Sequence, residues 1–210
     1  METNIGKKVF CLSLLGALLS AASFGALDLL KREVAPTDAL AGVRKAPSLD
    51  DITWKEIAFG ASHSLGLDNH GKLYSWGSNN KGQLGNNTTT DSLLPICLTT
   101  LSGSPLHDVS IAHIAAGDSF SAAIDNSGKL YTWGYNGNGQ LGNNTLTNSK
   151  VPLCLTTTSF GTPETNGLYG SSVTSIALGG SHAAAISNGA LYTWGLGSHG
   201  QLGRGTVNSS

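Results

Sequence analysis

The side chains best suited to catalysis or metal binding in this sequence are histidines, and two of them occupy one position of a recurring motif. His63 and His182 each follow a Gly-x-Ser triplet, and Phe120 follows the same triplet between them. A histidine can bind a metal or move a proton, but a phenylalanine ring carries no atom that does either. We therefore expect both histidines to be structural, each hydrogen-bonded within its own repeat with its ring packed as that of Phe120.

The remaining histidines form no pattern of known chemistry. His70, His107, His113 and His199 are scattered, without the His-x-x-x-His or His-Glu pairing of a zinc hydrolase site. The sequence also lacks a Gly-x-Ser-x-Gly nucleophile elbow and a Gly-x-x-x-x-Gly-Lys-Ser/Thr phosphate loop. We predict no catalytic residue, no metal site, no cofactor and no enzymatic activity.

Charge and composition narrow the class of protein further. The formal net charge is −1, so the chain has no basic excess of the kind that nucleic-acid binding normally requires. We therefore expect no nucleic-acid partner. Only 12% of the residues are charged and 28 are glycine, a composition typical of short strands joined by tight turns.

The three cysteines, Cys11, Cys97 and Cys154, include no Cys-x-x-Cys pair, so neither a zinc site nor a thioredoxin-type site is indicated. Cys97 and Cys154 hold equivalent positions in successive copies of the repeat described next. Equivalent outer positions of adjacent repeats should lie farther apart than the roughly 7 Å between Cα atoms that a disulfide allows. We expect no disulfide between them.

Three segments of the chain repeat one pattern, in which Leu-Tyr-x-Trp-Gly is followed by Gly-Gln-Leu-Gly. Three matches of this length do not arise by chance, so the chain is built from repeats. The recurring residues, which we expect to be structural, are His63, Trp76, Gly77, Gly82, Gln83, Gly85, Trp133, Gly134, Gln140, Gly142, His182, Trp194, Gly195, Gln201 and Gly203.

Each copy shows the alternation of apolar and small residues that favours β-strands, as at Leu65 and Leu67. Asp68 and Asp125 recur at the tip of the first hairpin, where we assign their carboxylates to turn formation. A further strand follows the Gly-Gln-Leu-Gly loop of the first two copies, around Pro95 and Pro152. Four short strands per unit predict propeller blades, and we place them at residues 52–100, 109–158 and 173–206.

The first copy reads Gly-x-Leu-Tyr-x-Trp-Gly-x-Asn-x-x-Gly-Gln-Leu-Gly from Gly71 to Gly85. This string closely resembles the repeat of the chromosome-condensation-regulator (RCC1) family, and the resemblance covers residues 52–206; in the third copy Gly197 replaces the loop asparagine. The resemblance implies an all-β fold, a partial RCC1-like β-propeller of about three four-stranded blades with the last one incomplete, whereas full propellers of this family have about seven.

The segment before the repeats has a different character. Lys7 and Lys8 precede an apolar run over residues 9–19 and then small residues, the pattern of a signal peptide. The rivals are a membrane anchor, since residues 9–27 approach the roughly 20 apolar residues that a membrane helix needs, and an N-terminal helix on a soluble protein. We expect a hydrophobic helix in residues 1–26, a linker over 27–51, and export (secreted or periplasmic), with membrane anchoring by residues 9–27 as the alternative.

Repeat proteins bury what recurs and bind with what differs between copies. The most divergent segments are the connections at 101–110 and 159–172, and the second holds a mixture of apolar anchors and polar groups suited to a protein interface. A plain variable loop is the alternative. The candidate partner-binding residues are Phe160, Pro163, Glu164, Leu168 and Tyr169.

These observations favour a non-enzymatic scaffold that binds a protein partner not identified by the sequence. The resemblance adds a rival, guanine-nucleotide exchange on a small GTPase, which members of that family perform. A third reading is a truncated fragment of a longer RCC1-repeat protein. The third copy stops at Ser210, before the residues that would form its last strand, so we expect either a longer natural product or self-association that covers the open faces.

Overall fold

The computed structural model describes residues 51–157 and 167–207, which belong to one compact unit. The hydrophobic helix, the signal peptide or anchor and the linker expected before residue 51 lie outside the described residues, as do Phe160, Pro163 and Glu164 of the predicted binding loop. Among the described residues, no helix is long and apolar enough to cross a membrane.

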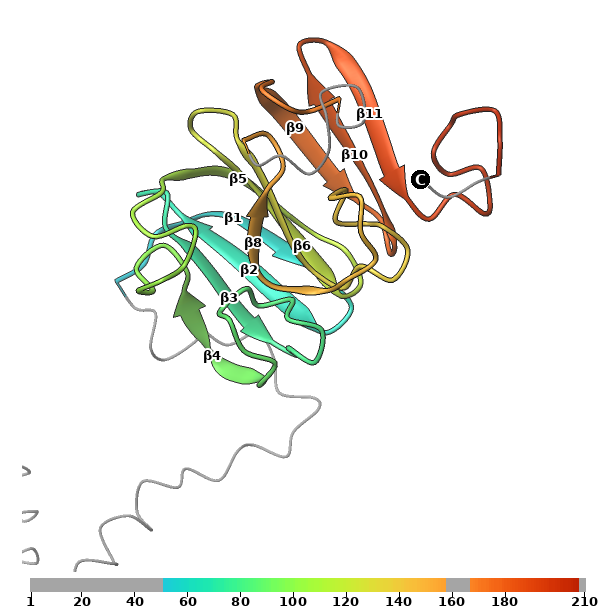
Figure 1. The fold of residues 1–210 in the computed structure, drawn as a ribbon. Coiled ribbons are helices and arrows are strands. Elements are labelled where there is room, and N and C mark those ends of the chain that lie inside the picture. The colour runs from blue at the N-terminus through green and yellow to red at the C-terminus, as the bar shows by residue number, and fades with distance from the viewer. Residues whose placement is uncertain (1–50, 158–166, 208–210) are drawn as a thin grey trace, which may run out of the picture. The chain divides into compact units, whose positions relative to one another are not determined.

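The described residues fold into three antiparallel sheets, one for each repeat (Figure 1). Strand order is β1-β2-β3-β4 in the first sheet, β5-β6-β7-β8 in the second and β11-β10-β9 in the third. The expected all-β fold with three blades is confirmed, and the third sheet has three strands among the described residues. The strands are β1 Trp54–Phe59, β2 His63–Asp68, β3 Leu73–Gly77, β4 Ser92–Cys97, β5 Ile111–Ala116, β6 Phe120–Asp125, β7 Leu130–Gly134, β8 Ser149–Cys154, β9 Val173–Leu178, β10 His182–Ser187 and β11 Ala190–Gly195.

An aspartate closes the central hairpin of the first two blades. Asp68 accepts the backbone N–H groups of His70 and Lys72 through Oδ1, both at 2.8 Å. Asp125 accepts the equivalent pair in the second blade at 2.8 and 2.9 Å. These bonds occupy the carboxylates in the turn, as the sequence predicts. The third hairpin is shorter and has Asn188 at a φ of 52°.

A buried asparagine organises the loop that follows the third strand. Asn136 is fully buried; its Nδ2 donates to Asn143 Oδ1 at 2.9 Å and to two backbone carbonyls, and its Oδ1 accepts the N–H of Leu141 at 2.9 Å. Asn79 makes the matching bonds in the first blade. Gly197 stands at this position in the third blade, so its loop has no such amide.

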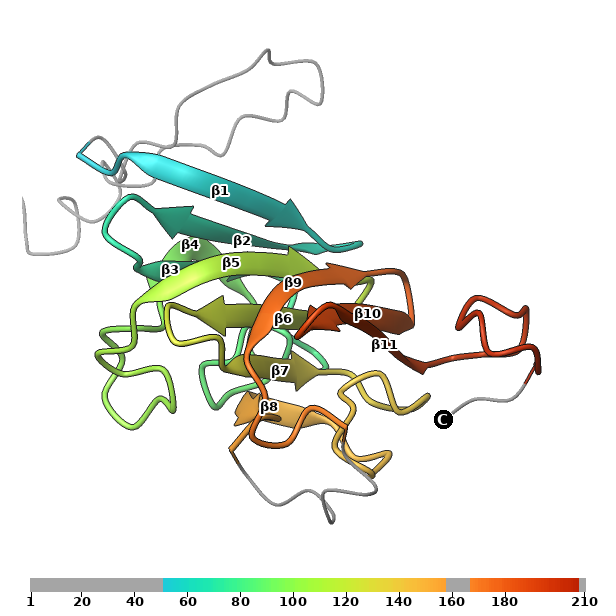
Figure 2. The same ribbon diagram turned by 90° about the horizontal axis from the view of Figure 1, so that it is seen from above.

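The core lies between the sheets, which stack face to face (Figure 2). One apolar cluster joins Leu65 of the first sheet to Ile114 and other side chains of the second. Another joins Phe120 of the second sheet to Ala183 of the third. Because each sheet buries its face against a neighbour, the stability of one blade depends on the next.

Asn136→Ala tests how much the buried amide stabilises its loop. The substitution removes four or more hydrogen bonds and leaves buried partners unsatisfied, so we expect the free energy of unfolding to fall by about 2–4 kcal/mol. Asn80→Ala, at an exposed position of the equivalent loop, is the control and should cost less than about 0.5 kcal/mol. Urea denaturation measures both, and equal losses would contradict this role.

Candidate functional site

A tryptophan of each following blade is held by the Gly-Gln-Leu-Gly loop of the blade before it. Trp133 donates its indole N–H to the backbone carbonyl of Gln83 at 2.8 Å, and Trp194 donates to that of Gln140 at 2.8 Å. A Cβ on Gly85 would lie 2.8 Å from Trp133 Nε1, so only glycine admits the ring this closely. The glycine, glutamine and tryptophan that recur in the sequence therefore form a joint between blades.

The first joint also contains a buried polar pair. His63 Nε2 lies 2.9 Å from Ser121 Oγ, and that hydroxyl donates to the Gln83 carbonyl at 2.9 Å. His63 is 3% exposed, and its Nδ1 is buried without a hydrogen-bond partner. Burial lowers the pKa of His63 to about 4, so the ring is neutral at pH 7. The expected bond within its own blade is wrong, because the partner belongs to the next blade.

The second joint uses apolar residues where the first uses polar ones. Phe120, equivalent to His63, is fully buried, and Ala183, equivalent to Ser121, belongs to the same apolar cluster. His182, at the same position in the third blade, is partly buried. In the first joint a histidine thus bonds a serine, and in the second a phenylalanine shares an apolar cluster with an alanine. This pairing explains how one repeat position accepts both ring types.

The tyrosine of the third strand faces the outer strand. Tyr131 donates its hydroxyl to Asp125 at 3.2 Å and pairs across the ladder with Cys154; Tyr74 pairs in the same way with Cys97. Burial, followed by the neighbouring Cys97 and Asp68, raises the pKa of Tyr74 to about 12. Both cysteines are free of disulfides.

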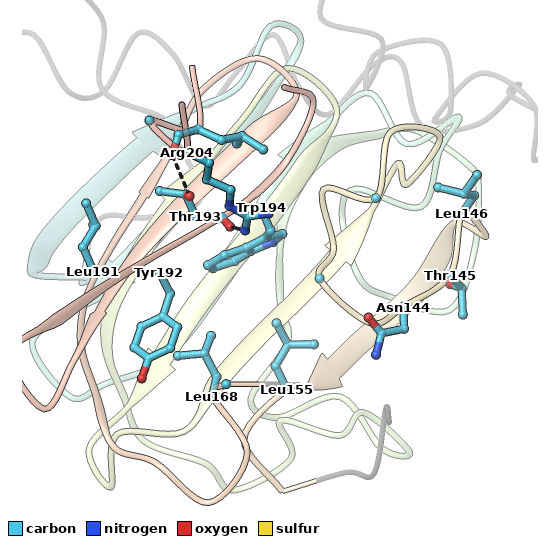
Figure 3. A pocket seen from close by; sticks show the side chains of 15 residues that line it. Asn144, Thr145, Leu146, Leu155, Leu168, Leu191, Tyr192, Thr193, Trp194 and Arg204 are labelled. Atoms are coloured by element: carbon cyan, nitrogen blue, oxygen red, sulfur yellow. Dashed lines mark hydrogen bonds between the residues drawn. The ribbon is translucent and has the colours of Figure 1, made fainter. Parts of the chain in front are cut away.

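A groove opens beside β11, between the third sheet and the outer part of the second blade. Its volume is about 880 Å³. Figure 3 shows Leu155 and Leu168 lying between Tyr192 on one side and Asn144 on the other. Arg204 donates from its guanidinium to the backbone carbonyl of Thr193, on the outer edge of β11. The groove therefore combines apolar walls with the outer edge of β11, on which no described strand lies.

The predicted binding loop is only partly described. Leu168 is 5% exposed and belongs to the apolar core, so it is an internal anchor that also lines the groove. Tyr169 is 43% exposed and is available to a partner. Sequence reasoning missed the groove residues Leu191 and Arg204. The repeat alignment could have indicated Leu191, because it places this residue at the position of Leu73, which is fully buried in the first blade.

No group of three or more His, Cys, Asp or Glu side chains within 51–157 and 167–207 could hold a metal ion. His107 pairs with the exposed Asp108 at 3.0 Å, and His113 lies 3.6 Å from Glu56. These are isolated surface pairs, which contribute little to stability. The Ser121 hydroxyl and the indole nitrogens of Trp133 and Trp194 donate to backbone carbonyls of the preceding blade, an arrangement that positions the blades.

Comparison with known families identifies the repeat. The family described as Regulator of chromosome condensation (RCC1) repeat matches residues 70–124, 127–186 and 188–210. A second family of the same description matches residues 54–83 and 111–140. The chain belongs to the RCC1 repeat family. The tryptophan joints described above are therefore joints between RCC1 repeats.

Curated relatives share the RCC1 repeats over part of their length. The chain is 37% identical over 161 residues to the ultraviolet-B receptor UVR8 of Arabidopsis thaliana, an alignment that covers 76% of this chain and 33% of that protein. It is 35% identical over 164 residues to the probable E3 ubiquitin-protein ligase HERC4 of Homo sapiens, covering 77% and 14% respectively. The chain thus spans about a third or less of these relatives.

Solved structures show the same arrangement of blades. Human WBSCR16 matches with a TM-score of 0.63 and 28% identity, over 80% of this chain and 40% of that one. Yeast RCC1 (Prp20), in a crystal structure with Kap60, matches with a TM-score of 0.61 and 26% identity, over 78% and 37%. These similarities support an RCC1-type stack of blades in the described residues.

The buried His63 makes the first joint sensitive to pH. Its pKa is about 4 in the folded protein and near its ordinary value of 6.5 when unfolded, so the unfolded chain binds this proton at higher pH. The stability that depends on neutral His63 is fully present above pH 6.5. It should fall by about 3 kcal/mol as the pH drops from 7 to 4.

The double variant His63→Phe/Ser121→Ala is the matched comparison, because it copies the residues of the second joint. Unfolding free energies measured by urea denaturation between pH 7 and pH 4 should fall less in the variant, by about the 3 kcal/mol assigned to His63. Identical pH dependence in the two proteins would show that His63 does not titrate as the joint requires.

Proposed function

We propose that this chain is a non-enzymatic RCC1-repeat scaffold that binds another protein. The observation that carries the proposal is that the recurring residues form bonds between neighbouring blades. The indoles, glutamine carbonyls and His63–Ser121 pair all bond between blades, and surfaces that differ between repeats stay open. Such surfaces provide the specificity of repeat scaffolds.

The second connection and the groove beside it are the surface we assign to the partner. Tyr169 is 43% exposed and follows Leu168, which lines the groove. A tyrosine beside an apolar groove supplies contact area and a polar group together, a combination enriched at protein interfaces. The corresponding turn in the first connection has His107 and Asp108 instead, so the two connections present different chemistry.

Guanine-nucleotide exchange on a small GTPase is the second candidate. The observation in its favour is the similarity to Prp20p of Saccharomyces cerevisiae, a protein whose structure was reported with its binding to Gsp1p and histones; the TM-score is 0.59 and the identity 26%. The match covers 37% of that chain. Any exchange surface that Prp20p forms with its remaining blades is therefore not compared with this chain. The export that we propose from residues 1–26 fits poorly with an intracellular GTPase partner.

Ligase activity is not carried over from the HERC relatives. The alignment to human HERC4 covers 14% of that protein, and it falls on the repeats. Similarity over the repeats supports a shared scaffold, and function must be argued from the site itself.

Site-specific photo-cross-linking tests the scaffold function. A benzophenone amino acid at position 169 should capture a discrete partner in an extract of the native host, because this side chain is exposed beside the groove. The same benzophenone amino acid in place of Lys129, an exposed hairpin position in the second blade, is the control. It should capture none of the proteins that are captured at position 169. Identical adducts at both positions, or none at 169, would argue against this surface.

The same protein, added to a panel of small GTPases loaded with fluorescent nucleotide, separates the two candidates. The scaffold proposal expects nucleotide release at the intrinsic rate. Acceleration of about tenfold or more for one GTPase would favour exchange instead.

A further inference from the structure

Three segments of the described chain have the Asn-x-Thr pattern that accepts N-linked glycans. They begin at Asn86, Asn87 and Asn143, in the loops that lead to β4 and β8. A related pattern, Asn-x-Ser at Asn208, lies outside the described residues. A glycan is bulky and hydrophilic, and it is joined to the side-chain amide nitrogen. The folded blade therefore accommodates a glycan only where that amide reaches solvent.

Two of these asparagines are used inside their own loops. Asn143 is 6% exposed, and its Oδ1 accepts the Nδ2 of Asn136 and the hydroxyl of Thr145, both at 2.9 Å. Asn86 is half-buried and accepts the Nδ2 of Asn79 in the same way at 3.0 Å. Both side chains hold a loop around its buried asparagine, so a glycan on either one would strain that loop.

Asn87 differs from both. Its side chain is exposed and makes no hydrogen bond to a described residue. Its backbone is fixed instead, because its N–H donates to the carbonyl of Lys150 at 2.9 Å and its φ is 62°, a left-handed conformation that asparagine tolerates. Thr89, which completes its acceptor pattern, is also exposed. The loop thus presents a free amide from a well-positioned backbone.

A small hollow lies beside this amide. Its volume is about 190 Å³, and it is lined by Asn86, Asn87, Val151 and residues 101–104 of the first connection. Sites that take drug-sized ligands measure about 300–1,000 Å³, so this hollow accepts a group no larger than a single sugar ring. It gives the first sugar of a glycan on Asn87 a place against the blade.

We infer that Asn87 is an N-glycosylation site, modified as the chain enters the lumen of a eukaryotic secretory pathway. In the transfer, Asn87 Nδ2 forms a bond to the anomeric carbon of a lipid-pyrophosphate-linked oligosaccharide. The bond from that carbon to the pyrophosphate oxygen breaks, the lipid pyrophosphate leaves with the electron pair, and the amide gives one proton to a base of the transferase. The inference goes beyond the proposed scaffold function, and it rests on the export that we propose from residues 1–26.

The fold selects among the three patterns after the transfer. The transferase meets the chain before the blades form, so each asparagine is open to it at that stage. A glycan on Asn143 would then have to fit a position that is 6% exposed, and one on Asn86 would disturb its bond to Asn79. Chains that cannot reach the native fold are removed by cellular quality control, so we expect the exported protein to carry its glycan at Asn87.

The first test is mass spectrometry of the protein purified from its native host and treated with peptide N-glycosidase. This enzyme converts a glycan-bearing asparagine to aspartate, so the modified position can be read directly. We expect the conversion at Asn87 and not at Asn86 or Asn143. Protein from the native host without a glycan at Asn87, or folded protein with one at Asn86 or Asn143, overturns the inference.

Matched variants of the whole chain, expressed with its own residues 1–26 in cultured eukaryotic cells, test the acceptor pattern. All carry Ser210→Ala, which removes the pattern at Asn208. Thr89→Ala should lose completely the gel shift that the glycosidase reverses, whereas Thr89→Ser keeps the pattern and should retain the shift. Position 89 is exposed, so neither change disturbs the fold.

A Thr89→Ala chain that keeps the shift, or a parent chain that shows none, overturns the inference. The cross-link at position 169 is measured separately, so the proposed scaffold function stands or falls independently of the glycan.

Discussion

The stack of blades depends on a hydrogen bond from the indole of one blade to the backbone of the blade before it. The Gln83 carbonyl accepts Trp133 Nε1 and Ser121 Oγ, so two side chains of the second blade meet on one atom of the first. The absence of a side chain at Gly85 lets the ring reach that atom. Burial strengthens such bonds, because their loss would leave polar groups without water.

This joint explains why so many residues recur without forming an active site. The glutamine supplies a carbonyl, the glycine supplies space, and the tryptophan supplies both a donor and apolar area. What varies is the chemistry around the bond, polar in the first joint at His63 and Ser121 and apolar in the second at Phe120 and Ala183. Function is therefore expected on surfaces outside the joints, which differ from repeat to repeat.

Much of the fold could be predicted from sequence because the strands, hairpins and loops depend on local patterns. Alternation around Leu65 and the aspartate at position 68 indicate a hairpin without reference to the rest of the chain. The partner of His63 could not be predicted in this way, because Ser121 lies in another blade. For the same reason Leu168, in a variable connection, was expected at the surface and instead packs in the core between two blades.

The joint is tested most directly by comparing Gly85→Ala with Gly203→Ala. Both glycines have positive φ, 73° and 66°, so both substitutions carry a similar backbone strain of about 1 kcal/mol. A Cβ at Gly85 also meets Trp133, with Nε1 at 2.8 Å, whereas nothing lies within 4 Å of one at Gly203. Urea unfolding should show Gly85→Ala to be the more destabilising by about 2 kcal/mol or more. Equal losses would contradict a stack held together by this close approach.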